Sequence, residues 1–558
     1  MNIRYITSIC LLSGAIAATA QDLTTEITVD RTVVTELPAA APLASVFPAS
    51  PDGNGNVFTL KLTQYMQWAD FLAAPLNLNA PLYTGFNPGP DYRGYAMAGY
   101  FPAYNAKAAV GYSAIKNRDS HLGVSLGFDG YSYKYDGNKT LNNTFRAKID
   151  GFHRFSTGTV FTARADYHYS SLENFGEDRV ADSFRLRAGL YNREKFRAGL
   201  EFDYFGINDA FPVGDSYAGK PRDLRFSAGG AYILALGEKT NLDFGVKADV
   251  INRNGVQDMF TATGDYSFTA CLVELNPALR YASGNFKAHV GVKLSMAHNT
   301  TSGKYSLAPD VTLVWTPSGI VDIYARADGG HELRGFRWQY EVSPFSLGPD
   351  AECMSKSPVN GRAGINLRPL SGLQVGLFAG YSSWRNAPVL MRYNTWESIG
   401  NFTRLASNYN YIDLKGANYG FEASYEVAEW GRVAVDGTVY SEGDPTAADR
   451  AKFVGNARLS VRPIDKLTID VDYRLRTSRR YIAINYIHNN GDDTYIYEHD
   501  GDMPLGDVSD FGIRGTYKIT PRFSAFLRLD NVFGKRYQIL PDLYSRTIHG
   551  LLGVSYVF

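Results

Sequence analysis

The chain has 558 residues, and its 56 basic and 56 acidic side chains leave no net charge that would attract nucleic acid. Past the N-terminus no apolar run reaches the ~18 residues that a membrane-spanning helix needs. Aromatic residues make up 14% of the chain, with 38 Tyr and 32 Phe. This proportion is typical of a protein that presents side chains to two membrane–water interfaces.

The N-terminus has the features of a secretory signal. Arg4 supplies a positive charge, Ile9 to Ala18 form a short apolar region, and Ala18-Thr19-Ala20 is an A-x-A cleavage site before Gln21. The apolar region is too short to span a membrane. We therefore predict a signal peptide at residues 1–20, cleaved after Ala20.

Residues 21–91 are expected to form a largely irregular N-terminal extension. Pro38, Pro42, Pro48 and Pro51 recur in a stretch that is otherwise rich in Ala, Val and Thr. Such a composition favours extended chain over a packed core. The third predicted segment, residues 92–558, is expected to form a β-barrel.

From Tyr92 onward the chain is a series of segments with a period of two, which indicates β-strands. In Lys466 to Arg476, for example, Leu467, Ile469 and Val471 alternate with polar residues. An apolar face beside a charged face fits a membrane barrel, in which one face meets lipid and the other a polar lumen. Because lipid cannot satisfy unpaired backbone groups, such a sheet must close on itself.

Turn signals set the strand count. Ten short turns rich in Gly, Pro, Asn or charge begin near residues 117, 156, 192, 236, 283, 317, 369, 429, 463 and 520. Longer polar connections lie between them, at Gly206 to Arg222, Glu332 to Pro358, Arg385 to Tyr409 and Ser478 to Gly506. Two strands per short turn, with one strand before the first and one after the last, predict an all-β transmembrane antiparallel barrel of about 22 strands. Short periplasmic turns and long extracellular loops are the expected asymmetry.

The C-terminus ends in a hairpin. Phe523, Ala525 and Leu527 predict one strand, which is expected to continue into Asn531-Val532-Phe533-Gly534-Lys535-Arg536-Tyr537. A polar connection around Pro541-Asp542 then leads to the final strand, where Val554, Tyr556 and Phe558 alternate. This hairpin resembles the end of outer-membrane barrels, and the Asn-Val-Phe-x-Lys-x-Tyr run resembles the penultimate strand of TonB-dependent receptors. The resemblance implies a barrel-assembly signal at Tyr556 and Phe558.

The chain departs from this family at its N-terminus. TonB-dependent receptors carry a plug domain of more than a hundred residues, whereas about 70 residues lie between the cleavage site and the first strand. Glu26-Ile27-Thr28-Val29 is only faintly similar to the family's TonB-contact box. We therefore expect a receptor-type barrel of Bacteroidota-like character without a plug.

Two groups of side chains are candidates for binding. The first group faces the predicted lumen. It forms either a wall of paired charges, or a path for a solute, or a seat for a plugging segment. Its members are Arg146, Lys148, Asp150, Arg185, Arg187, Asp322, Arg326, Asp470, Asp472, Arg474 and Arg476. The second lies in the predicted long loop Tyr481 to Asp510 and is either solvated or in contact with a ligand, partner or hard cation; its members are Asp492, Asp493, Tyr495, Tyr497, Asp500 and Asp502.

The sequence contains no recognisable catalytic, cofactor or metal motif. Its nine histidines form no H-x-x-x-H pair, and no phosphate loop or G-x-S-x-G elbow occurs. Cys271 and Cys353 remain after signal cleavage, and whether they pair is left open. We expect no enzyme and no cofactor.

Two functions remain open. One is transport or ligand uptake across the outer membrane by a plugless TonB-dependent-receptor-type barrel. The other is a non-transporting structural or assembly partner of an outer-membrane protein complex. Both imply contact with outer-membrane lipid and barrel-assembly machinery, and a protein partner that gates or caps the barrel is a further expectation. An open diffusion pore is a weaker alternative, because a barrel of this size would leak large solutes.

Overall fold

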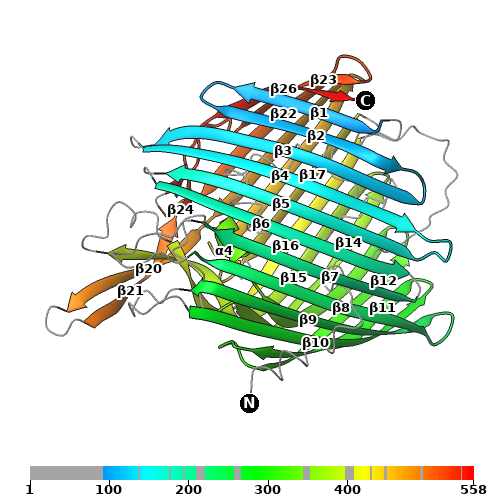
Figure 1. Cartoon of the computed structure of the whole chain (residues 1–558). Helices are drawn as coiled ribbons and strands as arrows, with labels where there is room; N and C mark the ends of the chain where they lie inside the picture. The colour runs from blue at the N-terminus through cyan, green and yellow to red at the C-terminus, as the bar shows by residue number, and fades with distance from the viewer. Residues whose placement is uncertain are drawn as a thin grey trace.

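The computed structural model describes residues 92–558 except for 136–137, 175–176, 193–194, 209–219, 257–265, 343–351, 396–406, 428–429, 445–448, 490–493 and 542. The predicted signal peptide (residues 1–20) and N-terminal extension (residues 21–91) lie outside the described residues. Strands make up nearly all of the described chain, and Figure 1 shows them as one large tilted barrel.

The strands run in chain order around the barrel. The first thirteen are β1 (Gly94–Phe101), β2 (Asn105–Lys116), β3 (Ser120–Tyr135), β4 (Asn138–Arg154), β5 (Val160–Asn174), β6 (Glu177–Asn192), β7 (Phe196–Ile207), β8 (Arg222–Ala235), β9 (Thr240–Val256), β10 (Tyr266–Ser283), β11 (Phe286–His298), β12 (Tyr305–Ser318) and β13 (Val321–Leu333). After the helix α4 (Phe336–Val342) come β14 (Met354–Leu370), β15 (Leu373–Thr395), β16 (Ser407–Val427), β17 (Gly431–Tyr440), β18 (Phe453–Ile464), β19 (Leu467–Thr477), β20 (Arg479–Asn489), β21 (Thr494–Leu505), β22 (Val508–Lys518), β23 (Phe523–Asp530), β24 (Gln538–Leu540), β25 (Leu543–Tyr544) and β26 (His549–Val557).

The barrel closes with 22 antiparallel strands, as the turn spacing predicts. Strands β1 to β19 pair in sequence, β19 pairs with β22, β22 with β23, and β23 with β26. β26 then pairs with β1, from Tyr95 opposite Val557 to Tyr100 opposite Leu552, so the sheet has no open edge. All ten predicted short turns join consecutive barrel strands at one end, which confirms the predicted strand boundaries there.

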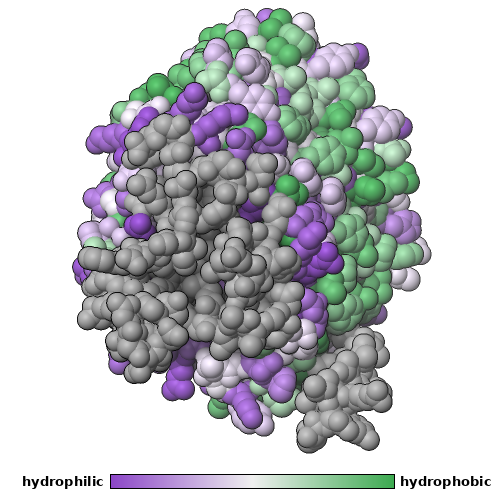
Figure 2. All heavy atoms as spheres, turned by 60° about the vertical axis from the view of Figure 1, so that its left-hand side comes forward, coloured by the Kyte–Doolittle hydropathy of each residue, from purple (hydrophilic) through white to green (hydrophobic). Residues whose placement is uncertain are grey.

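The outer surface of the barrel is apolar. Phe145, Ile149, Phe184, Leu186 and Ile323, for example, are 37–49% exposed. Figure 2 shows hydrophobic side chains gathered along one flank of the barrel. So large an exposed apolar surface on a closed sheet fits a barrel surrounded by lipid. Within the described residues, no helix has the length and apolar character needed to cross a bilayer.

The last strand seals the barrel with the residues predicted as an assembly signal. Tyr556 and Phe558 are exposed on the outer surface, and their rings stack at a centroid separation of 6.1 Å. Gly94 N donates to the Phe558 carbonyl over 2.8 Å, and Phe558 N donates to the Gly94 carbonyl over 2.9 Å. The chain end is therefore tied to the first strand, while its role as an assembly signal stays a prediction.

Two predictions about the long connections are wrong. The Asn531–Tyr537 run does not extend β23, because Asn531 (φ +48°) and Gly534 (φ +64°) adopt left-handed conformations that turn the chain. The predicted loop from Tyr481 to Asp510 is mainly the β20–β21 hairpin, which projects beyond the barrel in Figure 1. β20 also pairs in parallel with the end of β15, from Met391 opposite Ile482 to Thr395 opposite Tyr486.

Candidate functional site at the extracellular mouth

Two connections at the extracellular end, the end opposite the short turns, fold into the barrel. One is the β13–β14 connection, which carries α4. The other is the β23–β26 connection, residues 531–548, which carries the β24–β25 hairpin. We call α4 and the β23–β26 connection the roof. Figure 1 shows α4 and β24 towards the left end of the barrel, the end from which β20 and β21 project.

α4 packs against the inner wall on strands remote from its own. The Phe336 and Tyr340 rings lie 5.5 Å and 5.2 Å from the Phe205 ring of β7. Both side chains are buried in a cluster with Ala181 and Ile207. Because Phe205 follows the inward-facing Asp203 at a spacing of two, this contact places α4 inside the barrel.

Polar contacts fix the same helix to the wall. Arg337 pairs with Asp203 and donates to the Tyr204 carbonyl over 3.3 Å. Phe336 N donates to the Asp223 carboxylate, and the Tyr340 and Ser170 hydroxyls are 3.1 Å apart. α4 therefore bridges from β13 to β5, β7 and β8.

The β23–β26 connection enters the lumen because of Asn531. Its side-chain amide donates to the Lys535 carbonyl over 2.7 Å and to the Arg546 carbonyl over 2.6 Å, which brings the two ends of the connection together. Tyr537 OH then donates to Asp510 over 3.1 Å. The motif that resembles a receptor strand thus directs the chain inward instead of along the wall.

The tip of this connection is apolar, although a polar connection was predicted. Tyr537, Ile539, Leu540 and Leu543 are 2–6% exposed. They form one cluster with buried residues of five barrel and extracellular strands, and Trp338 of α4 packs against it; the strand residues are Tyr131, Leu172, Leu390, Leu505 and Val508. The two halves of the roof therefore meet, and together they span the lumen from β3 and β5 to β15.

Arg479 clamps the connection from the β20 side. This fully buried side chain pairs with Asp449 and donates to the carbonyls of Gln538 over 2.6 Å and Ile539 over 3.0 Å. A third bond runs to the Gly506 carbonyl over 3.0 Å. Burial raises the pKa of Asp449, but Arg476 and Arg479 outweigh burial and hold this pKa below its ordinary value. The clamp is therefore ionised at neutral pH.

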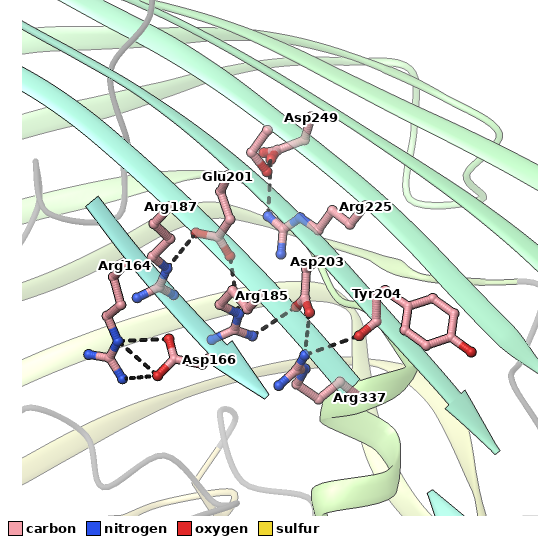
Figure 3. A network of polar contacts seen from close by, with 11 residues as sticks. Arg164, Asp166, Arg185, Arg187, Glu201, Asp203, Tyr204, Arg225, Asp249 and Arg337 are labelled. Atoms are coloured by element: carbon pink, nitrogen blue, oxygen red, sulfur yellow. Dashed lines mark hydrogen bonds and ion pairs between the residues drawn. The ribbon is translucent and has the colours of Figure 1, made fainter. Parts of the chain in front are cut away.

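Five strands of the inner wall carry a row of alternating charges, part of which is drawn in Figure 3. In register, Lys148 of β4 lies opposite Asp166, Asp166 opposite Arg185, Arg185 opposite Asp203, and Asp203 opposite Arg225 of β8. Arg185 and Asp203 are 2.8 Å apart. Opposite charges on facing positions stabilise a sheet and neutralise its polar face.

The neighbouring row contains the remaining predicted wall residues of this region. Arg187 pairs with Glu201 at 3.0 Å, and Asp150 pairs with Lys148 at 2.8 Å. Arg146 lies opposite His168 in register. Arg187 and Asp150 thus have partners of opposite charge on the wall, whereas Arg146 faces a histidine.

The other predicted wall residues lie on β13 and β19, further around the barrel. Asp322 accepts from Thr316 over 2.8 Å and pairs with Arg368, and Arg326 lies opposite Arg362. On β19, Asp470 lies opposite Arg514, Asp472 opposite Arg458, and Arg474 opposite Asp510, while Arg476 pairs with Asp449 at 2.6 Å. The structure therefore distributes the predicted set around the wall instead of gathering it in one site.

The predicted extracellular contact residues fall in and around the β20–β21 hairpin. Asp492 and Asp493 lie outside the described residues, and Tyr495, Tyr497 and Asp500 lie on β21. Asp502 accepts from Arg450 over 3.1 Å and lies 3.6 Å from Arg480. Its carboxylate therefore ties the hairpin to the β17–β18 connection.

Sequence reasoning missed the residues that build the roof. Phe336, Arg337, Tyr340 and Arg479 were not selected, because their significance depends on partners far away in the chain. The one available signal was the aromatic and basic run at 336–340 within a connection that was expected to be polar.

Metal-ligand clusters and a disulfide bond are both absent from the part of the chain that the structure describes. Among the described residues no group of three His, Cys, Asp or Glu side chains is placed to hold a metal ion. Cys271 and Cys353, whose pairing was left open, are not joined by a disulfide.

Comparison with solved structures identifies the fold. The ferric enterobactin receptor PfeA of Pseudomonas aeruginosa is similar over 84% of this chain and 80% of its own, with a TM-score of 0.57 and 12% identity. The FrpB iron transporter of Neisseria meningitidis is similar over 88% and 83%, with a TM-score of 0.56 and 13% identity. The copper transporter OprC is similar over 84% of this chain and 80% of its own, with a TM-score of 0.57 and 12% identity. No family model and no curated protein matches the sequence.

These similarities confirm the sequence resemblance at the level of fold. The chain has the barrel fold of outer-membrane receptors and transporters, and the structures that it resembles are not enzymes. An outer-membrane location follows from this fold and the apolar outer surface.

Proposed function

We propose that the chain is an outer-membrane transport barrel of the TonB-dependent-receptor type that works without the family's plug domain. The observation that carries this proposal is the 22-stranded barrel itself, the size of the plugged outer-membrane transporters. A non-transporting barrel has no need of so wide a polar lumen. The structural similarity to PfeA, FrpB and OprC, whose names describe a receptor and two transporters, also supports a transport function.

The plugless character is part of this proposal. In this proposal the roof restricts the outer mouth, and residues 21–91 act on the periplasmic side. Outer-membrane lipid and the barrel-assembly machinery are the expected partners, and a further protein partner would gate or cap the barrel from the periplasm.

Single-channel conductance in a planar bilayer tests the proposal. The full-length mature chain is compared with a variant that lacks residues 21–91. We expect the full-length chain to be closed for most of the time, because the roof crosses the mouth. Steady, wide conductance by the full-length chain would instead identify an open diffusion pore and contradict the proposal.

A second function, as a structural or assembly partner of an outer-membrane complex, is favoured by one observation. The roof is tied to the wall by buried contacts of both charged and apolar kinds, as expected for a permanently closed barrel. Deletion of the gene distinguishes the two functions. Loss of an energy-dependent uptake supports transport, whereas stable co-purifying proteins without any uptake defect support the structural role.

A further inference from the structure

The two halves of the roof are held in different ways, and we propose that α4 is a movable gate while the β23–β26 connection is its fixed frame. The gating role rests on the proposed transport function, but the motion itself can be measured without any transported solute.

The wall beneath α4 stays neutralised when the helix leaves. Asp203, which binds Arg337, also binds Arg185 of the wall at 2.8 Å. Asp223, which accepts from Phe336 N, also binds the buried Arg253 at 3.0 Å. Departure of α4 therefore leaves no wall carboxylate without a cation, which removes the largest penalty for breaking a buried ion pair.

The helix gives up few fully buried apolar side chains. Phe336 and Tyr340 lie in the cluster on Phe205, and the partly buried Trp338 packs against the cluster of the β23–β26 connection. Arg337 would pass to water, where its charge is well solvated. Both the docked and the released positions of α4 thus satisfy their polar groups, which is the requirement for a two-state element.

The β23–β26 connection lacks this freedom. Its release would expose four buried apolar side chains, Tyr537, Ile539, Leu540 and Leu543. It would also remove Arg479 from the carbonyls of Gln538 and Ile539. Four buried apolar anchors, against two buried anchors and the partly buried Trp338 for α4, together with the two Arg479 hydrogen bonds make this half of the roof the more stable one.

The chain provides a bend at the start of the α4 segment. Strand register shifts between Asp328 and Gly330, and Gly330 has a φ of +115° that L side chains rarely adopt. Gly335 directly precedes α4, and a methyl group added there would have no neighbour closer than 3.5 Å. Gly330 lies within β13, which remains paired with β14 as far as Leu333 opposite Met354, so Gly335 is the glycine through which α4 joins β13 and at which its direction can change.

Cysteine labelling at two positions of β5 tests whether α4 moves independently of the β23–β26 connection. Ser170 and Leu172 are neighbours on the inner face of β5, both buried. Ser170 contacts Tyr340 of α4, whereas Leu172 belongs to the cluster that the β23–β26 connection closes. Ser170→Cys and Leu172→Cys are placed singly in the full chain with Cys271 and Cys353 replaced by alanine. Folding is checked by heat-modifiable migration, and labelling uses a membrane-impermeant maleimide added to whole cells.

We expect the cysteine at position 170 to react at least about tenfold faster than the cysteine at position 172. Adding Arg337→Gln should accelerate labelling at position 170 further and leave position 172 unchanged. Equal protection of both positions, or equal acceleration of both by Arg337→Gln, would overturn the proposal. Hydrogen exchange of the unsubstituted chain gives a second readout, in which the amides of residues 336–342 should exchange faster than those of residues 537–540. Equal exchange in the two segments would also overturn it.

Discussion

Replacing Arg479 by alanine should release the β23–β26 connection from the barrel mouth. The substitution removes an ion pair with Asp449 and three hydrogen bonds to backbone carbonyls, at 2.6 Å, 3.0 Å and 3.0 Å. Release of the connection breaks the Arg479 hydrogen bonds to the Gln538 and Ile539 carbonyls, and a hydrogen bond from a charged donor contributes about 1.5–3 kcal/mol. We take the lower end for each of the two bonds, about 3 kcal/mol in total. Since ~1.4 kcal/mol is a factor of ten, the released fraction should rise about 100-fold.

Limited trypsin digestion measures this fraction. Lys535 and Arg536 are exposed, but Tyr537 beside them is buried, so the extended conformation that a protease requires forms only after release. At low protease concentration the cleavage rate follows the population of the released state. Mass spectrometry of the fragments identifies cleavage at these two sites in detergent-purified protein.

Arg480→Ala is the matched control, one residue away. The Arg480 side chain is 45% exposed and its carboxylate partner, Asp502, lies 3.6 Å away. Exposed pairs of this kind contribute less than about 1 kcal/mol, so cleavage should rise by about fivefold at most. If Arg479→Ala and Arg480→Ala are cleaved at similar rates, the clamp does not hold the connection and the reasoning is wrong.

Three other predictions follow from the same contacts. The pKa of Asp449 is lowered in the folded chain, so its stabilisation is present above the unfolded-state pKa and is lost as pH falls through the folded-state pKa. Hydrogen exchange of the amides of residues 537–540, corrected for the intrinsic pH dependence of exchange, should therefore accelerate only below about pH 4, and acceleration already at pH 6 would contradict this assignment. Gly330→Ala (φ +115°) should destabilise the chain by about 1–3 kcal/mol in thermal scans of heat-modifiable migration, whereas Gly515→Ala, whose added methyl has open space, should have no effect. Joint replacement of Tyr556 and Phe558 by alanine should lower the folded fraction in the outer membrane, and an unchanged fraction would show that these rings are not an assembly signal.

The barrel could be predicted from the sequence because every strand carries its own evidence. The alternation in Leu467 to Arg476 requires one face in lipid and the other in a polar lumen, whatever the neighbouring strand. Turn residues such as Ser283-Gly284-Asn285 mark a strand boundary locally, and Gly284 adopts a φ of +53° there. Ten such local signals were enough to obtain the strand count.

The roof could not be predicted, because its conformation depends on distant partners. The seven residues of α4 have no acidic residue in the first turn and no basic residue in the last, so nothing local favours a helix. Their contacts include Ser170, Asp203 and Asp223, all more than a hundred residues earlier. Likewise, alternation selected Arg185 as a wall residue, but only strand register shows that Asp203 faces it.

The position of the roof in the chain links closure of the mouth to closure of the barrel. The β23–β26 connection leaves the wall just before the last strand, yet its cluster includes Tyr131 of β3 and Leu172 of β5, beyond the seam where β26 meets β1. The Asn105 side-chain amide of β2 reaches across the same seam to the Gly550 carbonyl over 2.5 Å. These contacts join residues on both sides of the seam, so the packed roof requires a closed seam. A barrel with an open seam would therefore also have an open mouth, and protection of Lys535 and Arg536 from trypsin reports on both events.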